Sequence, residues 1–345
     1  MQYKTRAAYV KTYYQFQLRD RVVPEPGPGE VQLQIAACSI CGTDLSIAGK
    51  TAKKWSLLGH EISGVVTAIG PGVTRCAVGD RVALDSSAPC GECEECQAGR
   101  PIECLDVQSY WDKYMGFADY MVAPQQQVFQ AGSLPPEIAC LAEPTAVSID
   151  MVAVADVGAD DRVLIIGPGP LGLLAIPECK RRGVQHIWMA GRSHSQARMR
   201  VAEELGAEPI FVDKQDLTKY DFGRRGVTRV LVVAPPSELL VAAKVGAVGS
   251  IISYIGFAWT KQGVIKLDAD TFHDRRQQLR SSMARPGTRA AEALELLASG
   301  TFDPSKVLSG SFTLPDIADA MVQNRDDKTN AIKMVMVNPA CTWPA

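Results

Sequence analysis

The chain has 345 residues, more than one hydrophobic core usually organises, so we expect two domains. Hydrophobic residues make up 46% of it and charged residues 21%, as in an ordinary globular protein. With 36 basic and 38 acidic residues the net charge is −2, which gives no reason to expect a nucleic acid or an anionic membrane as partner.

The first part of the chain is typical of β structure. Residues 1–37 form short alternating stretches broken by the turn-rich segment 24–30, and residues 59–85 continue in the same style. A helix is predicted over residues 135–155, where apolar residues dominate.

From residue 161 onward, strands and helices alternate. The sequence predicts strands at 161–167, 186–190, 209–213, 229–234 and 250–256, with helices at 171–183, 196–206 and 237–246. Elements of this length and order predict a doubly wound parallel sheet, and so an α/β protein. Two helices, 289–300 and 314–324, and a last strand, 331–338, follow.

No apolar run reaches the roughly 18 residues that a membrane helix requires. The first residues also lack the apolar core of a signal peptide. We therefore expect a cytoplasmic protein.

Four cysteines lie close together in the polar segment 88–105, which is too short to form a hydrophobic core. They are Cys90, Cys93, Cys96 and Cys104. In a reducing compartment such a cluster indicates metal binding before disulfides. Four thiolates leave no open coordination position, so the pattern predicts a structural zinc site.

A nucleotide site is predicted directly after the first buried strand of the alternating region. Gly167, Gly169 and Gly172 form a GxGxxG fingerprint that opens a helix, with Pro170 and Leu171 between the last two. The helix N-terminus would face the pyrophosphate of a dinucleotide.

The end of the next strand predicts which coenzyme is used. A carboxylate there would select NAD, but the strand runs into Gly191, Arg192 and Ser193. Arg192 offers a cationic fork for a 2′-phosphate, Ser193 a hydroxyl and Arg198 a second charge, so NADP(H) is favoured over NAD(H). The alternative is that Arg192 is only a solvated surface residue and the chain uses NAD or either coenzyme.

Three further segments supply candidates for a catalytic metal. Cys41 opens the sequence Cys-Gly-Thr-Asp, which includes Thr43, and His60 stands beside Glu61. Glu143 lies in an otherwise apolar helical stretch, where a carboxylate is costly unless it is paired or bound to a metal.

Six motifs together resemble the zinc-containing medium-chain dehydrogenase/reductase superfamily, and most of all its sorbitol, xylitol and threonine dehydrogenase branch. They are, in chain order, CGTD (41–44), GHE (59–61), the four-cysteine lobe, GFADY (116–120), AEP (142–144) and GPGPLG (167–172).

The resemblance implies a fold and a division of the chain. A GroES-like catalytic domain would comprise residues 1–148, with the zinc lobe at 88–105, together with residues 285–345. A Rossmann domain for NADP(H) would occupy 149–284, and the active site would lie in the cleft between the domains. A homodimer or homotetramer is expected.

The resemblance also implies residue roles. Cys41 and His60 would bind the catalytic zinc, giving two zinc ions per chain. Glu61 would either bind the zinc or move in to displace a water. Glu143 would either be the fourth ligand or hold the zinc-bound water. Which of the two acids binds the zinc in the resting enzyme stays open. Thr43 would begin a proton relay from the substrate hydroxyl.

The function implied is zinc-dependent hydride transfer between NADP(H) and a secondary alcohol or ketone, with a polyol, sugar or cyclitol as substrate. One alternative is a simpler alcohol or an amino alcohol such as threonine, with NAD(H). A non-catalytic NADPH-binding zinc protein is disfavoured because the ligand set is complete.

Four features depart from the family pattern. Cys38 precedes Cys41 by three residues, and we interpret it as a strand residue rather than a ligand. The segment 45–58 is short, the segment 234–236 reads Ala-Pro-Pro where a Thr-Gly turn is common, and Pro177 should kink its helix.

Overall fold

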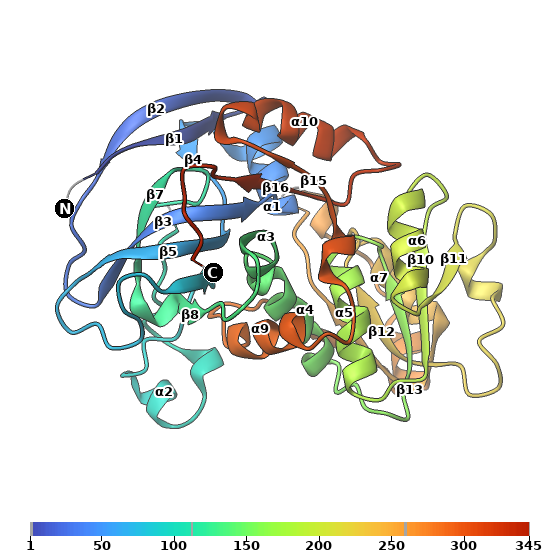
Figure 1. Cartoon of the computed structure of the whole chain (residues 1–345). Coiled ribbons are helices and arrows are strands. Elements are labelled where there is room, and N and C mark those ends of the chain that lie inside the picture. The colour runs from blue at the N-terminus through green and yellow to red at the C-terminus, as the bar shows by residue number, and fades with distance from the viewer. Residues whose placement is uncertain (1–2, 112, 259–260, 345) are drawn as a thin grey trace. The chain divides into compact units, whose positions relative to one another are not determined.

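The computed structural model describes residues 3–111, 113–258 and 261–344 (Figure 1). The chain divides into two compact units. Unit 1 comprises Met1–Ala146, Ala284–Asp327 and Lys333–Ala345, and unit 2 comprises Val147–Met283 and Lys328–Ile332. The α/β class predicted from the sequence is confirmed.

Unit 1 is built on two β-sheets. The smaller has the order β2 (Gln15–Val23), β1 (Tyr3–Lys11), β4 (Ser56–Leu57). The larger has the order β15 (Leu308–Phe312), β16 (Lys333–Val337), β3 (Glu30–Ser39), β5 (Glu61–Ile69), β6 (Arg81–Leu84), β8 (Val128–Gln130), and β7 (Tyr120–Pro124) also pairs with β3. β3 and β5 are buried along most of their length, and their apolar residues Val31, Leu33, Ile35, Ile62 and Val66 belong to the core of unit 1.

The helices of unit 1 are short. They are α1 (Gly42–Ser46), α2 (Glu94–Gln97), α3 (Pro136–Ala139), α9 (Ala290–Ala298) and α10 (Ile317–Asp326), while α4 (Ala142–Val154) begins here and continues into unit 2. The single helix predicted over 135–155 is wrong, because it is divided into α3 and α4. α4 restarts just before Pro144, whose missing N–H is harmless in a first helical turn.

Unit 2 contains a six-stranded sheet in which every pairing is parallel. Its order is β11 (Glu208–Phe211), β10 (His186–Gly191), β9 (Arg162–Ile166), β12 (Val227–Val232), β13 (Gly246–Tyr254), β14 (Gln278–Ser281). The doubly wound prediction is therefore confirmed. The strand order reverses between β9 and β12, and ligands of such sheets bind at the carboxyl ends of the strands at this point.

The helices of unit 2 are α5 (Pro170–Arg181), α6 (Gln196–Glu204), α7 (Glu238–Val245) and α8 (Ala269–Asp274). α5 follows β9 and continues through Pro177 without a break. Leu164, Ile166, Val230 and Trp188 belong to a core on the sheet. Among the described residues, no helix has both the length and the apolar character needed to cross a bilayer.

Candidate functional site

The side chains of Cys41, His60 and Glu61 come together in unit 1. The Cys41 sulfur, a ring nitrogen of His60 and a carboxylate oxygen of Glu61 all lie within 4.8 Å of one another. The antiparallel pairing of β3 and β5 explains this, because Ser39 lies opposite Glu61 and Cys41 follows two residues later. Cys38 remains inside β3 and is fully buried.

This donor set suits zinc. A thiolate, an imidazole and a carboxylate are the ligands that zinc takes in proteins, and three of them leave one position open. Thr43 lies half-buried beside them, with its amide donating to the Cys41 sulfur at 3.5 Å.

Asp44, which we did not predict as a site residue, lies close to both Cys41 and His60. Its carboxylate accepts from the amides of Cys41 at 2.9 Å and Gly59 at 3.2 Å. The oxygen that accepts from Gly59 also lies 3.4 Å from His60 Nδ1, and that ring nitrogen makes no hydrogen bond among the described residues. Burial lowers the pKa of His60, but Asp44 and Cys41 outweigh this effect and raise it.

Two aromatic residues fix the position of His60. The Trp111 ring lies 4.7 Å from the imidazole, centroid to centroid. The buried Tyr110 hydroxyl donates to the His60 carbonyl at 2.9 Å. Trp111 thus packs against the imidazole and Tyr110 fixes the main chain of His60, and such support suits a metal ligand.

Lys333 is a second residue that the sequence did not reveal. Its ammonium is buried, donates to the Ile40 carbonyl at 3.2 Å and forms an ion pair with the Glu61 carboxylate. The Ser39 hydroxyl donates to the same Glu61 oxygen. One oxygen of Glu61 is therefore engaged by the protein, while the other remains for a metal.

Glu143 is buried near this group without belonging to the set of three. Burial raises its pKa to about 7, the charge of His60 lowers it, and the charge of Glu61 raises it. Asp85, also buried, has its pKa raised to about 8 by burial and by the charge of Glu143. The site thus contains more carboxyl groups than cations to balance them, and a divalent metal would relieve this imbalance.

The four predicted cysteines of the zinc lobe also converge. Their sulfur atoms lie within 4.8 Å of one another, at 3.9 Å for Cys90–Cys96 and Cys93–Cys104 and 3.6 Å for Cys90–Cys104. Four thiolates at about 2.3 Å from one zinc ion would lie about 3.8 Å apart in a tetrahedron. The cluster therefore has the dimensions of a structural zinc site.

The glycine fingerprint forms the turn between β9 and α5 in unit 2. Gly167 has a φ of +113°, and a Cβ there would lie 2.8 Å from the Val233 carbonyl. A Cβ on Gly172 would lie 2.3 Å from the Gly167 carbonyl. Gly169 caps α5, Pro170 is its first residue, and the Leu171 carbonyl accepts from Ser148. The turn presents a helix N-terminus at the switch point of the sheet.

The three residues predicted to bind a 2′-phosphate have different environments. Arg192 is exposed and forms no ion pair among the described residues. Ser193 donates through its amide and its hydroxyl to Asp213. Arg198 is largely buried and donates through Nε to the Ala331 carbonyl at 2.9 Å.

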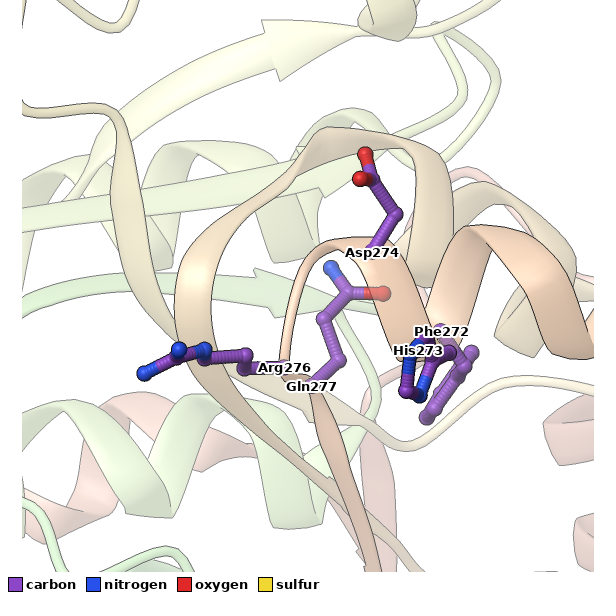
Figure 2. A pocket seen from close by; sticks show the side chains of 5 residues that line it. All are labelled: Phe272, His273, Asp274, Arg276 and Gln277. Atoms are coloured by element: carbon purple, nitrogen blue, oxygen red, sulfur yellow. The ribbon is translucent and has the colours of Figure 1, made fainter.

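A separate hollow of about 590 Å³ lies elsewhere in unit 2 and is shown in Figure 2. It is lined by Phe272, His273, Asp274, Arg276 and Gln277. None of the predicted site residues lines it.

Comparisons with known proteins agree with these motifs. A family model described as the alcohol dehydrogenase GroES-like domain matches residues 27–135. An L-threonine 3-dehydrogenase of Pyrococcus abyssi is 37% identical over 208 residues, which are 58% of this chain, and the match spans only 59% of the relative's length. A sorbitol dehydrogenase of Bacillus subtilis is 29% identical over 348 residues, covering 97% of each chain.

A solved structure shares the fold. An Escherichia coli alcohol dehydrogenase, rspB, in complex with NADH, superposes with a TM-score of 0.87 at 24% identity, covering 97% of this chain and 99% of that one. The GroES-like match, the full-length similarity to a sorbitol dehydrogenase and the two cysteine-containing clusters therefore support the resemblance to the zinc-containing medium-chain dehydrogenase/reductase superfamily.

Proposed function

We propose that the chain is a zinc-dependent oxidoreductase that transfers hydride between NADP(H) and a secondary alcohol or its ketone, with a polyol, sugar or cyclitol as substrate. The observation that carries the proposal is the grouping of Cys41, His60 and Glu61 within 4.8 Å. Two zinc ions per chain are expected, because the four-cysteine cluster is a second, separate ligand set.

The residues of the site have distinct roles in this proposal. Cys41, His60 and one of the two acids, Glu61 or Glu143, would hold the ion. Bound there, zinc would act as a Lewis acid that favours loss of the substrate hydroxyl proton. Thr43 would accept that proton as the first member of a relay. Lys333 would keep Glu61 charged and positioned, since its ammonium pairs with that carboxylate.

The coenzyme assignment rests on unit 2. The turn of Gly167, Gly169 and Gly172 would bind the pyrophosphate, and the exposed Arg192 would bind the 2′-phosphate. NADPH should therefore bind more tightly than NADH. One charge-assisted contact contributes about 1.5–3 kcal/mol, or roughly tenfold to a hundredfold in affinity.

A second candidate substrate class is an amino alcohol, with NAD(H) as coenzyme. The 37% identity to an L-threonine 3-dehydrogenase over 208 residues supports it. The two candidates differ in what the site must accept beside the metal, either further hydroxyl groups or an ammonium and a carboxylate.

Substrate screening decides between them. Purified protein, loaded with zinc, would be tested at alkaline pH with polyols, cyclitols, simple secondary alcohols and L-threonine, each with NADP⁺ and NAD⁺. Reduction of the coenzyme by a polyol is the expected result. In a separate binding test, Arg192→Ala should weaken NADPH binding while leaving NADH binding nearly unchanged. If protein that contains two zinc ions oxidised none of these alcohols, the proposal would be contradicted.

Light scattering would test the expected homodimer or homotetramer.

A further inference from the structure

Ser193 and Asp213 meet at the carboxyl edge of the parallel sheet in unit 2. β10 and β11 run side by side with Gly191 opposite Phe211, so Ser193 and Asp213, each two residues further on, leave the sheet at the same level. The Asp213 carboxylate accepts from the Ser193 amide at 2.8 Å and from its hydroxyl. The bonds from Ser193 lower the pKa of Asp213, so this exposed carboxyl group is ionised at neutral pH.

The usual position for a coenzyme-selecting carboxylate is closed in this chain. In the doubly wound fold that acid stands at the end of the second strand, which here is Gly191. A Cβ on Gly191 would lie 2.5 Å from the Met199 sulfur and 2.8 Å from Cγ of Pro168. An aspartate would fit there only if the side chains of Met199 and Pro168 shifted. The carboxylate that the structure does place at this edge, Asp213, follows the next strand.

Two oppositely charged side chains, Arg192 and Asp213, lie at this edge of the sheet. Of the three residues expected to hold a phosphate, Ser193 spends both donors on Asp213 and Arg198 donates to a main-chain carbonyl. Arg192 is left as the exposed cation among the three. The neighbouring residue, Ser193, is hydrogen-bonded to the Asp213 carboxylate. The coenzyme would therefore meet the positive charge of Arg192 and the negative charge of Asp213.

We propose that Asp213 is a specificity-determining residue for the coenzyme. Its carboxylate repels the 2′-phosphate of NADP(H) and accepts the 2′-hydroxyl of NAD(H), and so limits the preference that Arg192 provides. This inference rests on the coenzyme site proposed above. It predicts that both coenzymes bind, and that removing the charge of Asp213 makes the chain more selective for NADPH.

The test is a fluorescence titration of the full zinc-loaded chain with NADPH and with NADH. The series Asp213→Asn and Asp213→Lys removes and then reverses the charge. Asp216→Asn is the matched control, because Asp216 is an exposed carboxylate of the following turn that also accepts from an amide and a hydroxyl, those of Thr218. Melting curves of all variants show that each is folded.

The expected result is a rise in the NADPH-to-NADH affinity ratio of roughly threefold to tenfold for Asp213→Asn at low salt. Asp213→Lys should increase the ratio further, Asp216→Asn should leave it unchanged, and 0.5 M salt should reduce the effect. If both coenzymes bind and the ratio in Asp213→Asn stays that of the wild type, or matches Asp216→Asn, the inference is overturned while the coenzyme site stands. If neither coenzyme binds the wild-type chain, the proposed function and the inference both fail.

Discussion

Replacing Lys333 by methionine should destabilise the protein strongly, because it leaves the Glu61 carboxylate buried without its cation. Both side chains are almost inaccessible, at 2% and 1% exposure. Breaking a buried pair by removing one partner costs about 3–5 kcal/mol. For a unit of this size that is a fall in melting temperature of roughly 6–20 °C.

The energetic argument can be checked with a double-mutant cycle. Glu61→Gln alone leaves the Lys333 ammonium uncompensated and should also destabilise. Combining Glu61→Gln with Lys333→Met removes both charges, so the double variant should be more stable than the sum of the single losses predicts. Lys54→Met, at an exposed position of the same unit, is the control and should melt like the wild type.

Melting curves should be recorded with zinc and after treatment with a chelator. Without metal, the Lys333→Met loss should be largest, because no divalent cation then compensates the Glu61 charge. The reasoning is refuted if Lys333→Met melts within about 2 °C of the wild type in chelator, a change of less than about 1 kcal/mol. It is equally refuted if the two single losses simply add.

Three other results are expected. Metal analysis should give two zinc ions per chain, and a reproducible value near one would mean that one ligand set is misassigned. His60→Ala should abolish turnover while leaving a folded chain that still binds NADPH. Cys93→Ser should instead lower the melting temperature, because the lobe has no buried apolar residue in its helix and depends on metal for order. The reverse pattern would mean that the catalytic and structural sites are exchanged. Asp85 has a folded-state pKa of about 8 against 3.8 when exposed, so its contribution to stability is present below about pH 4 and lost as the pH rises through 8. Urea titrations in chelator should therefore show a smaller fall in the free energy of unfolding between pH 5 and pH 9 for Asp85→Asn than for the wild type. Equal falls would contradict the raised pKa of Asp85.

The sheet of unit 2 could be predicted because its strands are apolar runs bounded by turns. Strand β15 could not, since its Ser-Gly-Ser centre lacks the apolar character of a buried strand, and the polar β14 was missed for the same reason. The break between α3 and α4 was missed because hydrophobicity is continuous across it. Only the position of Pro144 hinted that a helix begins just before it.

The cysteine and histidine candidates for metal binding could be predicted from their motifs, because each stands in a short, distinctive context. Lys333 could not, since a lysine at the start of an apolar strand usually faces solvent. Its partner Glu61 lies 272 residues away in the chain. Asp213 was missed likewise, because only the parallel register of β10 and β11 brings it beside Ser193.

The position of the last strand, β16, inside its sheet has a consequence for biosynthesis. β16 lies between β15 and β3, and Lys333 contacts Ile40 across 293 residues of chain. While the ribosome is still making the intervening residues, residues 37–39 of β3 lack their pairing partner on one side. The Glu61 carboxylate also lacks its counterion, Lys333. Unit 2, whose sheet uses residues 162–281, can complete its pairing first, because it needs none of the late strands. This part of unit 1 should therefore be the last to become ordered, after β16 has left the ribosome.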